Sequence, residues 1–321
     1  MRTTTSPRIR RTRTTGRTLF VAFLFATTVA ALPTAVEAQS GEGRGLEEAA
    51  PASTADVVYG HKAGMALTFD VLHPTGPANG AGILYMVSGG WFSRWSPPGR
   101  TAARFDDLLD RGFTVFAVRH GSAPRFNVPE AHADVDRALR YIRLHADDWG
   151  VDVERLGVFG GSAGGHLSLM LGLAPDHRGP VAGSGSRTPE DLVTAAEGDD
   201  GVARADDRVA AVVAYYPPVD LRPLVGPNER FPALDFHDSL AADISPILFA
   251  TPDDPPTLLI HGDADELVPI RNSEIMYEAL QEKGVESAFI TIPGGDHGFR
   301  NAEHRARAEA AMVEWFVEHL D

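Results

Sequence analysis

The stretch Leu156-Gly-Val-Phe-Gly160-Gly-Ser162-Ala-Gly164-Gly-His166 joins a short apolar segment to a segment of helix-forming residues. It contains the only G-x-S-x-G pattern in the chain, centred on Ser162. A serine on a sharp strand-to-helix turn needs small residues two positions before and after it, so that its hydroxyl stands free. Gly160 and Gly164 meet this need. A glycine-rich turn without chemistry would look the same, so the rest of the chain must decide.

Apolar runs and helical patterns alternate on both sides of this turn, which predicts an α/β fold with a mainly parallel central sheet and helices on both faces. Two further segments, 174–207 and 223–250, are interpreted as small cap-like insertions at the pocket. The predicted strands are 66–72, 82–87, 114–119, 156–159, 209–215, 257–260 and 287–292, and the predicted helices are 101–111, 129–148, 163–173, 271–283 and 302–320.

Two later loops carry the partners that a nucleophilic serine needs. The hydroxyl needs a histidine to accept its proton, and the histidine needs a carboxylate to orient it. In α/β-hydrolases these partners follow in the order Ser, Asp or Glu, His, each just past a strand. Asp265 follows the apolar run 257–260 and His297 follows 287–292. The sequence therefore predicts Ser162 as nucleophile, His297 as base and Asp265 as orienting acid.

Other residues compete for these roles. Asp263 lies two positions before Asp265 and is the next choice for the acid. His166 and His261 are expected to have structural roles, opening a helix and ending a strand. The histidines show no spacing typical of a metal site, so no metal is predicted.

Acyl transfer also needs donors for the developing oxyanion. The backbone N–H of Ala163, directly after the nucleophile, is one expected donor. Gly89 and Gly90 follow the strand 82–87, and their backbone can turn N–H groups into a cleft. A tight turn that requires positive φ is the alternative interpretation, and both can hold together.

The sequence resembles the α/β-hydrolase superfamily from about residue 57 onward, specifically the bacterial esterase/lipase group. This group includes feruloyl and acetylxylan esterases and borders the hormone-sensitive-lipase-like carboxylesterases. The motif Gly160-Gly-Ser-Ala-Gly-Gly-His-Leu167 matches its nucleophile motif, and Arg119-His-Gly-Ser-Ala-Pro124 resembles its Y-R-L-A-P block. The resemblance implies a serine esterase that needs no cofactor.

One loop departs from the family pattern. Val87-Ser-Gly-Gly-Trp91 stands where the group has H-G-G-G-W, so Val87 and Ser88 replace a histidine and a glycine. The polar contacts of that histidine are therefore missing. The resemblance still implies an oxyanion loop at this place, with Gly89 and Gly90 on the donor positions.

The N-terminal segment 1–38 has an arginine-rich start, an apolar run and a small-residue end at Ala38, which is typical of a cleaved secretory signal peptide. The apolar run is too short to span a membrane, so we expect no membrane span in the mature chain. Residues 39–56 are expected to be a flexible N-terminus and 57–321 the catalytic domain. We expect a periplasmic or secreted protein.

Composition excludes several classes of function. The 321 residues include no cysteine, which excludes disulfides, thiolate nucleophiles and cysteine-bound metals. A formal net charge of −15 argues against a nucleic-acid partner, because phosphate backbones require a basic face. The oligomeric state is left open.

The substrate is expected to be a small-molecule or polymer-linked ester with a short-chain or carbohydrate-linked acyl group. Trp91, Trp95 and Tyr216 are candidate pocket residues, although core packing is an equal alternative for tyrosine. A compact serine exopeptidase of the prolyl-oligopeptidase-like type remains an alternative. A non-enzymatic binding protein on the same fold is disfavoured, because such a protein would be expected to have lost Ser, Asp or His.

Overall fold

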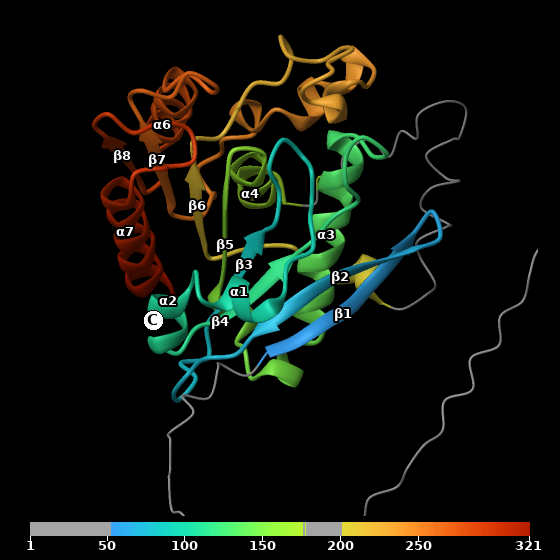
Figure 1. Ribbon diagram of the computed structural model, residues 1–321, viewed down its shortest axis with the longest axis vertical. Coiled ribbons are helices and arrows are strands. Elements are labelled where there is room, and N and C mark those ends of the chain that lie inside the picture. Colours follow the sequence, from blue (N-terminus) through green and yellow to red (C-terminus); the bar gives the residue numbers. More distant parts are fainter. Residues whose placement is uncertain (1–52, 176, 178–200) are drawn as a thin grey trace, which may run out of the picture. The chain divides into compact units, whose positions relative to one another are not determined.

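The computed structural model describes residues 53–175, 177 and 201–321 (Figure 1). All described elements belong to one unit, Glu48–Asp321. The predicted signal peptide and most of the first predicted insertion lie outside the described residues.

The described strands form one eight-stranded sheet in the order β1-β2-β4-β3-β5-β6-β7-β8. β1 and β2 pair antiparallel, as do β2 and β4, and every later pair is parallel. This is the mixed, mostly parallel α/β sheet that the sequence predicts. The strands are β1 Ser53–Lys62, β2 Met65–Leu72, β3 Gly82–Met86, β4 Thr114–Val118, β5 Leu156–Gly161, β6 Ala211–Tyr215, β7 Thr257–Gly262 and β8 Ser287–Ile292.

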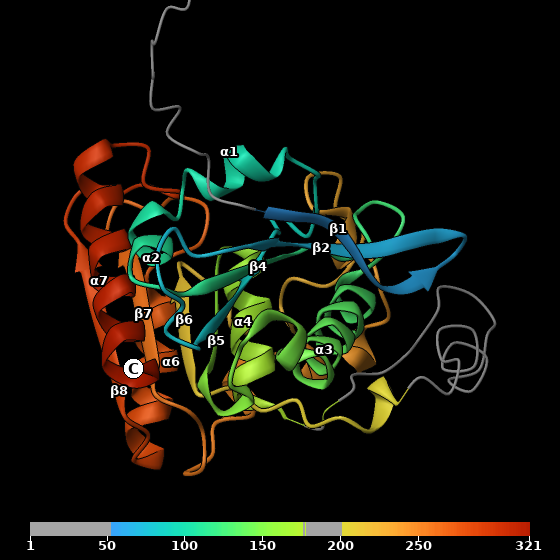
Figure 2. The same ribbon diagram turned by 90° about the horizontal axis from the view of Figure 1, so that it is seen from below.

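Helices cover both faces of this sheet (Figure 2). One apolar cluster joins the sheet to α3, α4 and α6, and a second joins it to α1, α2 and α7. Successive residues of a strand point to opposite faces, so Phe116 and Val118 pack in the first cluster while Val115 packs in the second. The helices are α1 Pro98–Ala102, α2 Asp106–Asp110, α3 Val128–Leu144, α4 Ala163–Leu173, α6 Arg271–Lys283 and α7 Ala302–Leu320.

Three of the predicted helices, 163–173, 271–283 and 302–320, have the bounds that the structure gives to α4, α6 and α7. The prediction for 129–148 is wrong at its end, because α3 ends at Leu144 and a 3₁₀ turn, Ala146–Trp149, follows. The single helix predicted over 101–111 is also wrong. The chain breaks between α1 and α2, where buried Phe105 packs edge-on against Tyr85 and Phe159.

The structure corrects the predicted start of the domain as well. β1 begins at Ser53, so the residues from Ser53 to Asp56 belong to an edge strand and not to a flexible N-terminus. The first half of β1 is mostly exposed and carries few apolar side chains, so it lacks the apolar pattern that predicts a strand. Within the described ranges, no helix is both long enough and apolar enough to cross a membrane.

The carboxyl ends of the parallel strands meet at one edge of the sheet, where open α/β sheets bind their ligands. Ser88 lies just beyond β3, Ser162 just beyond β5 and Tyr216 just beyond β6. Asp265 and His297 follow β7 and β8. Residues far apart in the sequence are therefore brought to the same edge.

Candidate active site

Ser162 sits on a strained turn between β5 and α4. Its backbone has φ 55° and ψ −120°, outside the usual regions for a residue with a side chain, and its N–H donates to the carbonyl of Tyr215 at 2.9 Å. A Cβ on Gly160 would lie 2.5 Å from the backbone carbon of Gly164, and one on Gly164 would lie 2.9 Å from the carbonyl oxygen of Met86. Both glycines are therefore required for the close approach that holds this serine.

Asp265 and His297 meet across the ends of β7 and β8. The Nδ1–H of His297 donates to Oδ2 of Asp265 at 2.7 Å, which leaves Nε2 free to accept a proton. The other oxygen of Asp265 accepts the backbone N–H groups of Leu267 and Val268 at 2.8 and 2.9 Å. The carboxylate is fully buried, whereas the imidazole is 20% exposed. This arrangement fixes the histidine ring while leaving it accessible.

The alternative acid, Asp263, is engaged elsewhere. It is exposed, and its Oδ1 accepts the backbone N–H of Gly294 at 2.6 Å. It thus ties the β8 loop to the β7 loop. The structure brings His297 to Asp265 and not to Asp263.

The two other histidines near the site are buried in hydrogen-bonded positions. His261 donates its Nε2–H to the carbonyl of Val268 at 2.8 Å and lies 3.3 Å from Oδ2 of Asp265, and burial lowers its pKa. His166 donates to the carbonyl of Ile244 at 2.8 Å, and burial lowers its pKa to about 3. Both contacts are of the structural kind that the sequence predicts.

Tyr216 lies between the nucleophile turn and His297. Its ring centroid is 4.6 Å from that of His297, and a Cβ on Gly161 would lie 2.8 Å from its hydroxyl oxygen. Its backbone has φ 36°, and the preceding residue supplies the carbonyl that binds the N–H of Ser162. Tyr216 therefore lines the side of the site that faces the histidine.

The glycine loop after β3 closes as a tight turn. Gly89 and Phe92 exchange two backbone hydrogen bonds of 3.0 Å, and Gly90 and Trp91 between them have φ of 59° and 58°. Positive φ at both central residues is the signature of a type I′ turn. We call residues 88–93 the oxyanion turn.

This geometry corrects one of the predicted oxyanion donors. The N–H of Gly89 is already donated to the carbonyl of Phe92, so it cannot serve an oxyanion while the turn is closed. The N–H groups of Gly90 and Ala163 have no hydrogen-bond partner among the described residues. These two remain available as donors.

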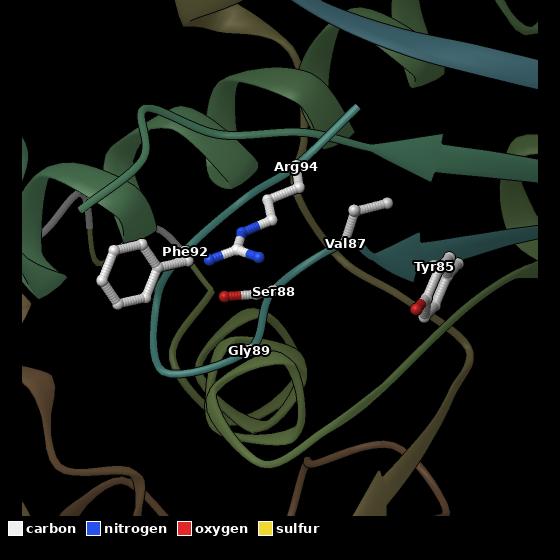
Figure 3. Close-up of a pocket in the computed structure, with 6 residues that line it drawn as sticks. All are labelled: Tyr85, Val87, Ser88, Gly89, Phe92 and Arg94. Atoms are coloured by element: carbon white, nitrogen blue, oxygen red, sulfur yellow. The ribbon is translucent and has the colours of Figure 1, made fainter. Parts of the chain in front are cut away.

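A pocket of about 450 Å³ opens beside the oxyanion turn (Figure 3). Of the predicted pocket residues, Trp91 is only 4% exposed and packs edge-on against His166, so it belongs to the core instead. Trp95 is 58% exposed and does not line this pocket. The residues that line the pocket are Tyr85, Val87, Ser88, Gly89, Phe92 and Arg94. In the sequence, only their position next to the glycine pair of the oxyanion turn points to this role.

Comparison with known proteins agrees with this architecture. The sequence matches the BD-FAE family over residues 69–280, more than half of the chain. The chain belongs to the BD-FAE family. It is also similar to two proteins of Mycobacterium tuberculosis, the probable carboxylic ester hydrolase LipM and the esterase LipC.

LipM is 28% identical over 75% of this chain and 54% of its own length, and LipC is 29% identical over 70% and 54%. The chain thus spans about half the length of these curated relatives. Among solved structures, a truncated carbohydrate esterase from gut microbiota has a TM-score of 0.69 and 28% identity, covering 85% of this chain and 98% of its own. This BD-FAE protein therefore shares its fold with structurally known esterases.

Proposed function

We propose that this BD-FAE protein is a serine carboxylic-ester hydrolase that acts on short-chain or carbohydrate-linked acyl esters through an acyl-enzyme. The observation that carries the proposal is the 2.7 Å hydrogen bond between His297 and buried Asp265, at the sheet edge where strained Ser162 projects. Membership of the BD-FAE family and similarity to proteins named as esterases support the same chemistry.

In the proposed first step, His297 accepts the hydroxyl proton of Ser162 as the oxygen attacks the ester carbonyl carbon. The tetrahedral oxyanion accepts hydrogen bonds from the N–H groups of Gly90 and Ala163. Asp265 orients His297 and stabilises its protonated form. The protonated histidine then gives its proton to the leaving alcohol, and the acyl group stays on Ser162.

In the second step the same groups act on water. His297 accepts a proton from the water molecule as its oxygen attacks the acyl carbon, and the second oxyanion uses the same two donors. Collapse of this intermediate returns the proton to Ser162 and releases the carboxylic acid. Apart from the ester and this water molecule, each step needs only groups that the protein itself supplies.

The direct test is Ser162→Ala, measured with p-nitrophenyl esters of increasing acyl length and with feruloyl and acetylated sugar esters. We expect a loss on the order of 10⁶ in kcat, because no other group replaces the nucleophile. Unchanged hydrolysis in this variant would contradict the mechanism. Aminoacyl p-nitroanilides are included in the panel, and turnover of the anilides alone would favour an exopeptidase.

We also propose export with cleavage after Ala38, on the basis of the arginine-rich start and the apolar run that precede it. Expression of the full chain in a bacterial host, followed by mass spectrometry of the periplasmic fraction, checks this. The expected mature N-terminus is Gln39. Recovery of uncleaved protein from the cytoplasm alone would contradict the proposal.

A further inference from the structure

A polar bridge connects the oxyanion turn to the segment that follows β4. Residues 120–123 form the hydrogen bonds to the turn, and we call them the clasp. Four hydrogen bonds join them: the Ser88 hydroxyl to His120 Nε2 at 2.8 Å, the His120 N–H to Ser93 Oγ at 3.2 Å, the Ser93 N–H to Ser122 Oγ at 3.1 Å, and the Ala123 N–H to the Trp91 carbonyl at 3.1 Å.

His120 has a defined role in this bridge because its other nitrogen is also engaged. Its Nδ1 lies 2.8 Å from the carbonyl oxygen of Gly121, which can only accept, so Nδ1 carries the hydrogen and Nε2 accepts from Ser88. Burial lowers the pKa of His120, which keeps the ring neutral and Nε2 an acceptor. The Ser88 hydroxyl is therefore held in one direction.

The clasp is anchored behind His120 by a buried ion pair. The N–H of Gly121 donates to Oδ2 of Asp134 at 2.8 Å, and Asp134 pairs with Lys62 at 3.0 Å. The side chains of this pair are 7% and 19% exposed. The oxyanion turn is thus connected to α3 and β1 through groups that have little freedom to move.

The bridge lies at the loop that departs from the pattern of the esterase group this sequence resembles. Val87 stands where related loops have a histidine, and here His120 reaches the same loop from a different strand end. We propose that Ser88 and His120 are positioning residues that hold the oxyanion turn so that the Gly90 N–H faces the developing oxyanion. The inference rests on the proposed esterase function.

The test is Ser88→Ala, which removes the one hydroxyl that binds His120 and adds no bulk to the turn. We expect kcat to fall 10- to 100-fold with KM within about threefold, because the oxyanion forms only after the substrate has bound. The affinity of a trifluoromethyl ketone, which forms a tetrahedral oxyanion on a serine, should fall by the same factor. Ser88→Thr keeps a hydroxyl and should recover most of the activity.

A matched control exists outside the site. His237 and Ser239 form an exposed pair with a 2.8 Å contact, and Ser239→Ala should leave kcat and inhibitor affinity unchanged. Full activity in Ser88→Ala, while Ser162→Ala is inactive, would overturn the positioning role and leave the proposed esterase function intact. A fall in kcat with unchanged affinity for the ketone would also overturn it.

An independent observation concerns charge around the pocket. Arg94 lines the pocket, with its guanidinium carbon 5.7 Å from the ring centroid of Phe92 (Figure 3). Arg104 donates to the hydroxyl of Tyr85, another lining residue, at 3.3 Å. Neither arginine forms an ion pair with any residue in the described ranges, although the chain carries a net charge of −15.

A third arginine, Arg230, packs on Phe231, whose ring lies against the oxyanion turn. Arg230 lies 5.3 Å from the ring centroid of Phe231, and a Cβ on Gly90 would be 2.9 Å from that ring. It too has no acidic partner in the described part of the chain. An arginine that lines a pocket without an ion-pair partner in the described residues can attract an anionic group of a ligand.

We infer that the preferred substrate, given the proposed esterase function, is an ester that carries a carboxylate, recognised by Arg94. The test compares monoethyl succinate with ethyl butyrate, which has the same acyl length without the charge, and follows hydrolysis by titration of the acid released. Arg94→Gln should lower kcat/KM for the succinate monoester about tenfold more than kcat/KM for the butyrate ester. Arg100→Gln, an exposed arginine on α1, is the control.

Raising the salt concentration should reduce the preference of the wild-type protein for the charged ester over the neutral one, because salt screens interactions between exposed charges. An equal loss on both esters, or no loss on either, would overturn the role of Arg94. Hydrolysis of the neutral butyrate ester measures the esterase function separately, so the two claims fail independently.

Discussion

Two serines in this molecule follow buried parallel strands, and each is paired with a histidine. The two pairs differ in the group that accepts the hydrogen bond from the second nitrogen of the histidine ring. Ser88 donates to His120, whose far nitrogen faces a backbone carbonyl. Ser162 has His297 as its proposed base, and the far nitrogen of that ring faces the buried carboxylate of Asp265. A carbonyl orients an imidazole, but only a carboxylate offsets the charge that the ring gains when it accepts a proton. A serine and a histidine therefore suit positioning at Ser88 and His120, and proton transfer at Ser162 and His297.

The largest test of this comparison is His297→Ala. We expect kcat to fall on the order of 10⁶, as expected for loss of a general base that activates a serine. Steady-state hydrolysis of a p-nitrophenyl ester measures it, with Ser88→Ala, expected to lose no more than about 100-fold, as the comparison. Losses of kcat of equal size in the two variants would contradict the assignment of His297 as the base and Ser88 as a positioning residue.

A smaller effect is expected for Asp265→Asn. The amide keeps the shape of the side chain but removes the charge and favours the wrong imidazole tautomer, so we expect a loss of about 10⁴ in kcat. Asp263→Asn is the matched control and should remain within about threefold. If Asp263→Asn were the more damaging of the two, the acid would have been misassigned.

The smallest expected effect is on the pH profile of Ser88→Ala. General-base activation of a serine predicts that wild-type activity falls toward acid pH. Burial lowers the pKa of His120, so this ring stays neutral as the pH begins to fall below the ordinary histidine range. The variant should therefore lose kcat without a change in the pH at half-maximal kcat/KM. A shifted midpoint would mean that the Ser88 and His120 pair takes part in proton transfer.

The parts of the fold and site that the sequence predicts well are those with a local signal. The nucleophile turn lies within one eleven-residue stretch, and the bounds of α4, α6, α7 and β8 follow from their own residues. Asp265 and His297 could be placed because each follows an apolar strand in a fixed chain order. The sequence alone could not show which aspartate binds His297, because Asp263 lies in the same loop as Asp265. The hydrogen bond in the structure identifies Asp265.

The rest depends on contacts that the linear pattern does not carry. Ser88 and His120 are 32 residues apart, and only the pairing of β3 with β4 brings them together. The closure of the turn engages the N–H of Gly89, and positive φ at Trp91 accompanies the burial of its ring in the core. β1 has mostly exposed residues in its first half and is specified by pairing with β2.

The most direct measurement for the central claim is covalent labelling with a fluorophosphonate followed by peptide mass spectrometry. Such reagents react with serines activated by a neighbouring base. We expect one adduct per chain, on the peptide that contains Ser162, with loss of ester hydrolysis in proportion to labelling and no adduct in Ser162→Ala. An adduct on Ser88, or complete inhibition with Ser162 unmodified, would contradict the account.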